Sequence, residues 1–282
     1  MGITSETFDF FLHCKNDGVS FERICQIGRQ KTFFDSQEYM SKYDDFSEQL
    51  FFDFLGAKSI DSLDYSDYEG ATIIHDMNLP VNKDMEERFS AVLDGGTLEH
   101  VFNYPVAIKN CMRMVEVGAH LILVTPANNF FGHGFYQFSP ELFFSVLGEQ
   151  NGFTQTQIFV QDDSFQWYKI KNPQDIKKRV DICCAERKEC LIYVVSKKIN
   201  STPQSLTVLQ SDYVLVWGKE EFPEIPGTVG GTSRRSILKT VKRLLRQILA
   251  RGAGCRILQD KEKIPKPWEN LYEKVNLKIK KS

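Results

Sequence analysis

Short apolar runs alternate with helical patterns along the first half of the chain. Runs of this length that are bounded by glycine, proline or acidic residues are typical of strands. A leading helix is predicted within residues 1–20, where Phe8, Phe10 and Phe11 cluster, and another over residues 36–55, closed by Gly56. The predicted strands are Arg23–Ile27, Ser59–Leu63, Ala71–Ile74, Ala91–Leu93 and Leu121–Val124. Alternating strands and helices predict an α/β fold with a mostly parallel sheet.

The segment 89–140 contains a complete strand, helix and strand unit. The strand Ala91–Leu93 stops at Asp94-Gly95-Gly96, and a helix follows that we expect to end at Gly118. The next strand, Leu121–Val124, ends at Pro126. Such a unit forms a right-handed crossover, and ligands bind beyond the carboxyl ends of parallel strands. The polar segments 94–103 and 126–137 are therefore predicted to share one functional edge.

The next part of the chain predicts a helix and two further strands. Ser139-Pro140-Glu141 is a helix start, and Gly152 is predicted to close that helix. Thr154–Val160 and Glu189–Ser196 have strand patterns. The charged insertion 162–187 between them either covers the functional edge or forms a surface hairpin.

Composition changes after residue 200 and suggests three regions. Residues 1–200 form the main domain, and 201–233 form a Pro- and Gly-containing linker with one short strand-like run, D-Y-V-L-V-W. Residues 234–282 form a basic extension, in which 234–250 is an amphipathic helix with a leucine-rich face and a basic face. That helix docks on protein or lies on an anionic membrane surface.

Composition and charge narrow the classes of function. The chain has 282 residues, 42% hydrophobic and 26% charged, with a net charge of -2, so no global basic charge favours nucleic acid. Seven irregularly spaced cysteines predict reduced thiols and a cytoplasmic location, and no zinc-type spacing is present, so no metal is expected. No apolar run approaches the ~18 residues that span a bilayer.

Several strings resemble those of class I S-adenosylmethionine-dependent methyltransferases. They are D-G-G-T-L-E-H-V after a strand, V-G-A-H-L at the next strand start, and a T-P loop followed by G-H-G-F-Y-Q-F-S-P-E-L-F. The resemblance covers roughly residues 20–200. It implies a Rossmann-like, mostly parallel sheet with helices on both faces and an antiparallel final strand, with S-adenosylmethionine as cofactor. The last string also resembles bacterial methyltransferases of glycan biosynthesis.

The resemblance also implies a set of cofactor-binding residues at successive strand ends. Asp64 stands where an acidic side chain accepts hydrogen bonds from ribose hydroxyls, with Asp61 and Asp67 as rivals. Asp76 would accept from the adenine amino group, with Met77 against the ring, although Asp76 before Pro80 also fits an Asx turn. The other predicted cofactor residues are Gly28, Arg29, Gln30, Asp94, Gly95 and Gly96. Only Gly28 matches the family's glycine-rich loop, in which the first strand turns into the first helix.

Methyl transfer needs alignment of donor and acceptor and removal of the acceptor's proton. Candidate bases on the predicted edge are His133 and His100, with Glu99 as a third group that caps or orients. A histidine in a loop also fits a purely structural role. Side chains predicted to hold the acceptor are Asn128, Asn129, Tyr136 and Gln137.

These features lead to two hypotheses of different classes. One is methyl transfer, by an O-methyltransferase, to a small hydroxyl or phosphoryl acceptor such as a sugar or polysaccharide precursor. The other is a methyltransferase-like subunit that has lost catalysis and serves in binding or assembly, which the altered glycine loop favours. A nicotinamide dehydrogenase and a serine hydrolase fit less well, because neither G-x-G-x-x-G nor G-x-S-x-G is present. Self-association or peripheral membrane contact through the basic extension is expected, and nucleic acid is not.

Overall fold

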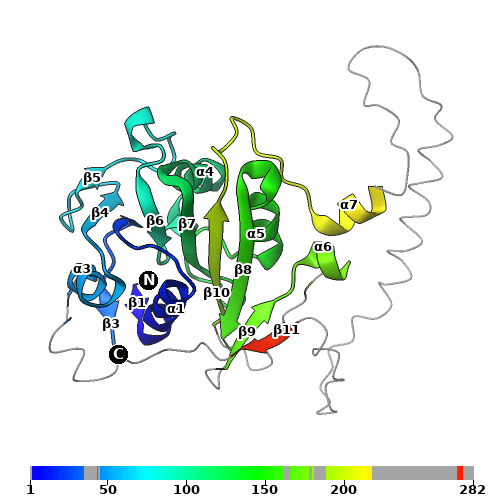
Figure 1. Ribbon diagram of the computed structural model, residues 1–282, viewed down its shortest axis with the longest axis horizontal. Coiled ribbons are helices and arrows are strands. Elements are labelled where there is room, and N and C mark those ends of the chain that lie inside the picture. The colour runs from blue at the N-terminus through cyan, green and yellow to red at the C-terminus, as the bar shows by residue number, and fades with distance from the viewer. Residues whose placement is uncertain are drawn as a thin grey trace. The chain divides into compact units, whose positions relative to one another are not determined.

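A large mixed sheet forms the centre of the protein in the computed structural model (Figure 1). The structure describes residues 2–34, 43, 45–161, 166–177, 180, 189–217 and 272–275. Among these, nine strands pair in the order β11-β9-β8-β10-β7-β6-β2-β4-β5. Their bounds are β2 Arg23–Ile27, β4 Ser59–Asp64, β5 Ile73–Ile74, β6 Phe89–Asp94, β7 Val115–Pro126, β8 Phe153–Gln161, β9 Trp167–Ile170, β10 Leu191–Lys198 and β11 Tyr272–Val275.

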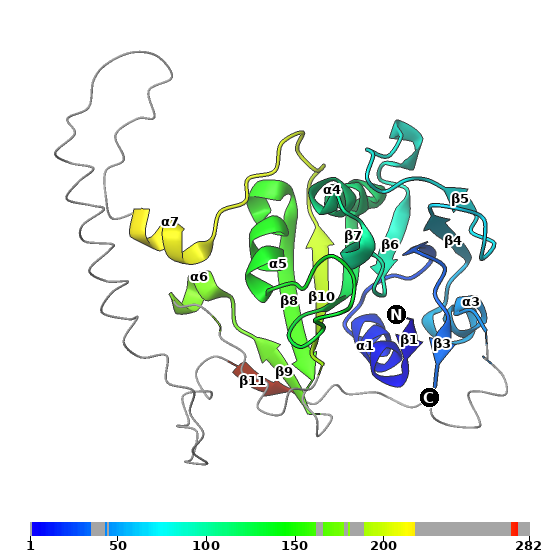
Figure 2. The same ribbon diagram turned by 180° about the vertical axis from the view of Figure 1, so that it is seen from behind.

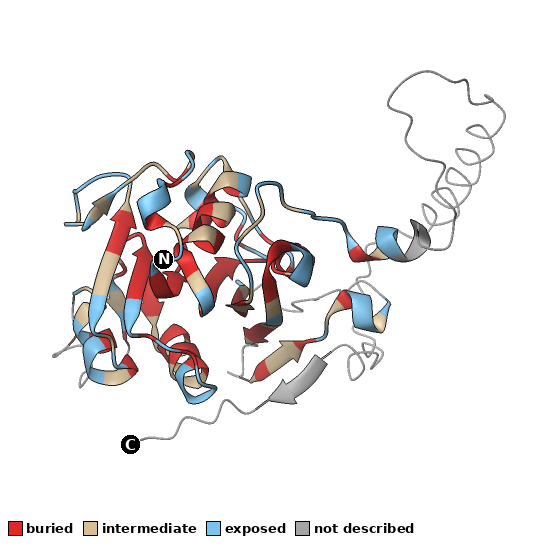
Figure 3. Cartoon of the chain, turned by 45° about the horizontal axis from the view of Figure 1, so that its top comes forward, coloured by how far each residue is buried: buried red, intermediate tan, exposed pale blue. Residues whose placement is uncertain are grey.

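The pairing directions confirm the predicted fold class. Strands β5, β4, β2, β6 and β7 are parallel neighbours. Strand β10 is antiparallel to both β7 and β8, so it lies between them as an inserted final strand. Strand β6 and the second half of β7, residues 121–126, are fully buried, as expected for a parallel sheet covered on both faces, and Figure 3 shows the buried residues in red. The protein therefore has a Rossmann-like α/β fold with an antiparallel final strand.

Helices cover the two faces of this sheet and give two separate cores (Figure 2). Helices α4 (Tyr104–Met114) and α5 (Pro140–Val146) pack on one face. Helix α1 (Ser5–Asn16), the short α3 (Glu48–Leu50) and a π-helical turn η1 (Phe51–Leu55) pack on the other. Short 3-10 turns are η2 (Lys83–Met85), η3 (Leu98–His100) and η4 (Glu149–Asn151).

The leading helix forms as its aromatic pattern predicts. Thr4 caps α1, because its Oγ1 accepts a hydrogen bond from the Thr7 amide at 3.3 Å. Phe8, Phe10 and Phe11 are all buried, and the Phe10 ring lies 5.4 Å from that of Tyr193 on β10. This aromatic packing fixes α1 across the antiparallel end of the sheet.

The segment after β2 differs from the prediction. The chain does not enter a helix there: β3 (Thr32–Phe33) pairs in parallel with β1 (Ile3–Thr4) in a separate two-stranded sheet. Lys31 bridges Phe46, and the Ser47 amide donates to the Gln30 carbonyl at 2.9 Å. Tyr43 is helical, but these backbone pairings interrupt the predicted helix at residues 45–47, and a helix is present again from Glu48. Residues 35–42 and 44 lie outside the described residues.

Two predicted helix ends are also wrong. Helix α4 ends at Met114, four residues before Gly118. Gly118 instead lies inside β7 with a φ angle of 93°, at the place where the pairing register between β7 and β6 shifts. A β-bulge, which glycine allows, therefore replaces the predicted helix end. Helix α5 ends at Val146, and Gly152 closes the following turn η4.

The insertion 162–187 extends the sheet. Strand β9 pairs with β8 in an antiparallel hairpin, and helix α6 (Pro173–Ile176) follows it. Trp167 of β9 is buried, and its ring lies 4.7 Å from that of Tyr193. Of the two predicted alternatives, the described part of the insertion is a hairpin at the sheet edge.

The C-terminal third is described only in part. The run D-Y-V-L-V-W, predicted to be strand-like, lies in helix α7 (Ser211–Trp217), at whose start the Tyr213 and Val214 amides donate hydrogen bonds to the Gln210 carbonyl. Strand β11, which the prediction lacks, pairs with β9. The predicted amphipathic helix 234–250 lies outside the described residues. None of the helices within the described ranges is long and apolar enough to cross a membrane.

Candidate functional site

Two loops bring Glu99, His100 and His133 together at the carboxyl edge of the sheet. Glu99 and His100 belong to η3 after β6, and His133 lies in the loop after β7. The Nε2 atom of His133 is 3.3 Å from the Glu99 Oε1 atom, and that of His100 is 3.8 Å from it. The two imidazole rings are 4.9 Å apart in an edge-to-face arrangement. The prediction that both histidines share one edge is therefore confirmed by their positions.

Backbone contacts hold the His133 loop over Glu99. The Phe135 amide donates to the Glu99 carbonyl at 2.8 Å. Gly134 has φ 67°, and a Cβ atom there would lie only 2.9 Å from the Glu99 carbonyl oxygen. The loop can approach this closely because residue 134 has no side chain.

The predicted acceptor-binding residues mostly shape this same loop. The Tyr136 hydroxyl donates to the Phe102 carbonyl at 2.6 Å, and the Gln137 Oε1 atom accepts from the Phe130 amide at 3.1 Å. Asn128 and Asn129 are exposed at its start, and the Asn128 carbonyl accepts from the Cys190 amide on the way into β10. The four residues therefore surround the His133 loop, and two of their side chains brace it.

A buried carboxylate pair lies beneath the histidines. Asp94 ends β6, and its Oδ1 atom accepts from the amides of Thr97 at 2.9 Å and Leu98 at 3.3 Å. Asp94 and Glu99 are both fully buried. The Asp94 Oδ2 and Glu99 Oε2 atoms have no hydrogen-bond partner within the described part of the chain, and neither does the nearby Tyr104 hydroxyl. Buried polar atoms are normally satisfied, so this cluster indicates a place where a ligand supplies the partners.

Burial and neighbouring charges shift the pKa values in this cluster. Burial, reinforced by the charge of Glu99, raises the pKa of Asp94 well above its ordinary value. Burial also raises the pKa of Glu99. The pKa of His100 is lowered, mainly by burial and next by the charge of His133. Burial is the largest cause of all three pKa shifts, and each shift favours the uncharged form of the side chain.

Gly28 and Gln30 form a tight turn between the ends of β2 and β6. Gly28 has φ 71°, and a Cβ atom there would be 2.5 Å from the Thr97 Oγ1 atom. The buried Gln30 side chain folds back, and its Nε2 atom donates to the Ile27 carbonyl at 2.8 Å. A Cβ atom on Gly95 would be 2.6 Å from the Gln30 Oε1 atom, which has no described hydrogen-bond partner. Gln30 therefore fills space that a glycine-rich loop leaves open.

Arg29 is also held by contacts within the fold. Its Nε atom donates to the Glu48 Oε1 atom at 2.7 Å, and its Nη1 atom donates to the Glu69 carbonyl at 2.7 Å. The guanidinium carbon lies 3.8 Å from the centre of the Phe46 ring. Arg29 thus ties the β2 loop to α3 and to the loop after β4.

The structure separates Asp64 from its rivals. Asp64 is the last residue of β4, and its Oδ1 atom accepts from the Tyr65 amide at 2.7 Å. Asp61 lies within the strand and forms a 3.0 Å ion pair with Arg88. Asp67 lies in an exposed turn, where its backbone carbonyl accepts a hydrogen bond from the Gly70 amide. Of the three, Asp64 is the one at the last position of the strand, and Asp67 lies in the loop that follows it.

Asp76 and Met77 have contacts that match the alternative interpretation. The Asp76 Oδ1 atom accepts from the Asn78 amide at 2.9 Å, which is the Asx turn expected before Pro80. Hydrogen bonds from Asn78 lower the pKa of Asp76. Met77 is buried in the core, where its sulfur lies 3.9 Å from the Asn110 Nδ2 atom. Both residues thus contribute to the local turn and core packing.

Sequence reasoning underrated Glu99 and missed Thr97, Tyr104 and Gly134. Glu99 follows a leucine within D-G-G-T-L-E-H-V, and an acidic residue directly before a candidate histidine was the available signal. No local pattern reveals that Glu99 is buried, because the covering loop comes 34 residues later. Gly134 had a signal, since glycine on both sides of His133 indicates close backbone approach.

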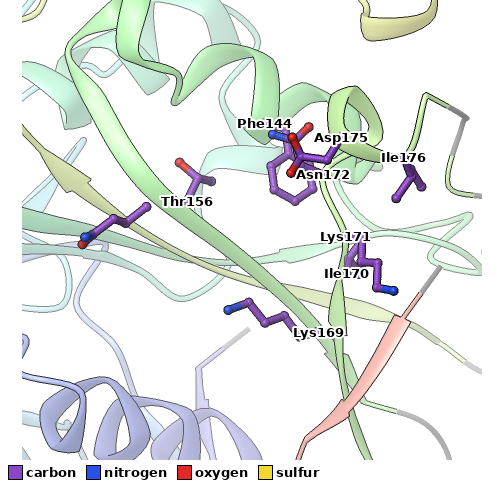
Figure 4. A pocket seen from close by; sticks show the side chains of 9 residues that line it. Phe144, Thr156, Lys169, Ile170, Lys171, Asn172, Asp175 and Ile176 are labelled. Carbon is purple, nitrogen blue, oxygen red and sulfur yellow. The ribbon is translucent and has the colours of Figure 1, made fainter. Parts of the chain in front are cut away.

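Two cavities lie away from these residues. The larger, of about 390 Å³, is lined by residues of α5, β8, β9 and α6, including Lys169, Lys171 and Asp175 (Figure 4). The smaller, of about 80 Å³, lies between α1, β7, β8 and β10 and is lined by His13 and His120 among others. None of the predicted site residues lines either cavity.

Comparisons with known proteins give similar solved structures. No model of a known protein family and no curated protein sequence matches the chain. The phosphoethanolamine N-methyltransferase 2 of Haemonchus contortus, solved with phosphomonomethylethanolamine and S-adenosylhomocysteine, has 10% identity and a TM-score of 0.44, over 70% of this chain and 53% of that one. The N-methyltransferase NodS of Bradyrhizobium japonicum has 12% identity and a TM-score of 0.39, over 69% and 96%. The MccD protein has 11% identity and a TM-score of 0.41, over 69% and 97%. The fold assignment itself rests on the strand order and pairing directions.

Proposed function

We propose that this protein transfers a methyl group from S-adenosylmethionine to a small hydroxyl or phosphoryl acceptor. The observation that carries the proposal is the gathering of Gly28, Asp64, Asp94 and His133 at the carboxyl ends of four adjacent or near-adjacent parallel strands. Ligands of doubly wound sheets bind at that edge. A fold alone does not determine function, so the argument depends on what these side chains can do.

The end of β4 suits a nucleoside. A carboxylate offers two acceptor oxygens to the two hydroxyls of a ribose, and Asp64 is half-buried at the strand end. When bound, S-adenosylmethionine supplies a methyl group on a positively charged sulfur. We infer that its adenosine part lies across the ends of β2 and β4, near Gly28, with Asp76 at the adenine side. Its amino-acid part would then lie toward Asp94, Gly95 and Gly96.

The pair of His133 and Glu99 suits proton removal from an acceptor. The Glu99 Oε1 atom is 3.3 Å from the His133 Nε2 atom, and the backbone contacts described above fix their relative position. His133 is one-third exposed, so an acceptor can reach its ring. We infer that His133 takes the acceptor's proton, that Glu99 stabilises the resulting imidazolium, and that His100 positions the acceptor.

Exposed aromatic rings beside the histidines support an acceptor with an apolar face, such as a sugar. Phe131 is 98% exposed, and Phe102 and Phe135 form an exposed edge-to-face pair with their ring centres 6.0 Å apart. Flanking aromatic rings with a few polar groups are typical of small-molecule sites. We therefore propose a sugar or polysaccharide precursor, methylated on oxygen.

A specific observation favours the second candidate, a catalytically inactive binding or assembly subunit. The Gln30 side chain fills the turn after β2, and Arg29 is held by Glu48 and the Glu69 carbonyl. If the cofactor binds at this turn, the side-chain amide of Gln30 must either form a hydrogen bond with it or move out of its way. The Gln30 Oε1 atom has no hydrogen-bond partner among the described residues, so it can accept a hydrogen bond from the cofactor.

Calorimetric titration with S-adenosylmethionine and S-adenosylhomocysteine distinguishes the two candidates. The proposed enzyme binds both. Asp64→Ala is expected to weaken binding by about 1.5–3 kcal/mol, because hydrogen bonds to a charged acceptor are lost. Asp67→Ala is the matched control, since Asp67 is an exposed aspartate in the next turn, and it should leave the affinity unchanged. Absence of binding by the unmutated protein would refute methyl transfer and favour the inactive subunit.

A further inference from the structure

We propose that Glu99, His100 and His133 form a binding site for one divalent transition-metal ion, such as Zn²⁺. Each side chain offers one ligand atom, and these three atoms lie within 4.8 Å of one another. Two imidazole nitrogens and one carboxylate oxygen are a frequent ligand set for zinc and related metals. The inference shares His133 with the proposed methyl transfer but does not require that activity.

The separations of the two histidine nitrogens from the Glu99 carboxylate oxygen fit a shared metal. Nitrogen and oxygen ligands lie about 2.0–2.2 Å from zinc, so two ligands at a tetrahedral angle are roughly 3.4 Å apart. The Glu99 Oε1 atom is 3.3 Å from the His133 Nε2 atom and 3.8 Å from the His100 Nε2 atom. Shifts of a few tenths of an ångström thus bring both nitrogens to ligating separations from the carboxylate.

The unsatisfied polar atoms provide an independent argument. Glu99 is fully buried, and its Oε2 atom has no hydrogen-bond partner among the described residues. Both Nε2 atoms face the same Oε1 atom, but only His133 is within hydrogen-bonding distance. A buried carboxylate with an unused oxygen and two converging imidazoles is stabilised by a cation, which accepts lone pairs from all three groups.

The surroundings leave room for an additional ligand. Glu99 approaches from the buried side, whereas the side chains of His100 and His133 are 47% and 33% exposed. The fourth position of a tetrahedral ion would therefore face solvent, as in zinc sites that bind a water or a substrate. Magnesium is disfavoured, because it prefers oxygen ligands.

Metal binding and proton acceptance by His133 exclude each other. With its Nε2 lone pair on a metal, a neutral His133 carries its proton on Nδ1, so neither ring nitrogen can take a proton from an acceptor. The metal-bound protein therefore cannot use the base proposed above, and Zn²⁺ is expected to inhibit turnover that depends on His133. The prediction of no metal from sequence considered Cys/His spacing only, and His133 lies 34 residues beyond Glu99.

The test is a titration of metal-stripped full-length protein with Co²⁺, in which binding is monitored by visible absorption. Competition with Zn²⁺ gives the affinity for zinc, and metal analysis gives the number of ions bound per chain. We expect one ion per chain and a d–d spectrum without a thiolate charge-transfer band. His100→Ala and His133→Ala should each weaken affinity at least tenfold, because losing only an outer-shell partner of a ligand already costs about 10–100-fold. His75→Ala is the matched control, because His75 is at the end of β5 and its Nε2 atom is 3.0 Å from the Leu79 carbonyl oxygen.

Three outcomes would overturn the metal site. The first is that the unmutated protein does not bind one metal ion per chain. The second is that both histidine variants bind the metal as tightly as the control variant. The third is an absorption spectrum with a thiolate band, which would show that cysteines bind the metal. Glu99→Gln tests the carboxylate, with circular dichroism verifying that the variant folds. Calorimetry with S-adenosylhomocysteine on the same metal-stripped protein tests the proposed function separately, so either proposal can fail alone.

Discussion

At the scale of single residues, Gly134 determines whether His133 can lie over Glu99. Gly134 has a left-handed backbone, and a Cβ atom would meet both the Glu99 carbonyl oxygen and its Cγ atom at 2.9 Å. The contact is with backbone as well as with a buried side chain, so relief requires the loop to move. The geometry of the site therefore depends on Gly134, a residue without a functional side chain.

We predict that Gly134→Ala lowers the free energy of unfolding by about 1–3 kcal/mol, from left-handed strain plus the displaced contact. Urea denaturation measures this. Gly132→Ala is the control, since Gly132 lies in the same loop outside the left-handed region, and a methyl group added there would meet no atom within 4 Å. Its effect should stay within ~0.5 kcal/mol. Equal midpoints for the two variants would show that the loop does not need glycine at residue 134.

At the scale of elements, the end of α4 depends on a buried lysine from β10. The Lys198 ammonium donates to the carbonyls of Met112 at 3.0 Å and Val115 at 2.7 Å, and it lies 3.4 Å from the Glu87 carboxylate. A cation there satisfies carbonyls at the helix C-terminus and complements its dipole. This contact fixes the point at which α4 gives way to β7.

Lys198→Met is expected to lower the free energy of unfolding by about 1–3 kcal/mol, because buried carbonyls lose their donor. Chemical denaturation followed by circular dichroism measures the change. The neighbouring Lys197 is half-buried, so Lys197→Met provides a control with the same side-chain exchange and a much smaller expected loss. If Lys198→Met and Lys197→Met had the same free energy of unfolding, the hydrogen bonds from Lys198 to the end of α4 would not contribute to stability.

Helix α1 and the strands β2, β4, β5, β6, β7, β8 and β10 could be predicted from sequence because local patterns determine them, whereas β1, β3, β9 and β11 were not predicted. The prediction gave Arg23–Ile27 with its observed bounds, and β8 and β10 within two residues of theirs at each end. The region after β2 could not be predicted in this way. Its backbone pairs with β1 and with Phe46, contacts between residues distant in sequence that no helical periodicity reveals.

The candidate site could also be predicted only in part. Topology predicted that His100 and His133 share one edge, because both follow parallel strands. The burial of Glu99 and the inward fold of Gln30 depend on tertiary packing. The same holds for Ser211–Trp217, whose apolar run fits either a strand or a helix.

At the scale of the whole molecule, stability should fall in mild acid because of His120 on β7. Burial, with a smaller effect of Lys197, lowers the pKa of His120 to about 4, against 6.5 unperturbed. Between pH 6.5 and 4 the unfolded state binds the proton and the folded state does not, so stability falls as the pH falls. His13, whose pKa burial also lowers, and Asp17 line the same cavity.

We expect His120→Gln to reduce the loss of unfolding free energy between pH 7.5 and 4.5 by about 1–2 kcal/mol, less than the full shift implies because the ring is only partly buried. Urea titrations of both proteins at the two pH values give the difference. Parallel pH dependence of variant and wild type would show that His120 does not contribute.

The central claim is that the carboxyl edge of the sheet binds the methyl donor. The most direct test is a crystal structure of the protein with S-adenosylhomocysteine at saturating concentration. We expect density for the ribose beside Asp64 and for the homocysteine part near Asp94 to Gly96, with Gln30 either contacting the ligand or displaced. Density for the ligand at another place, or an edge that stays empty with Gln30 still folded onto the Ile27 carbonyl, would contradict it.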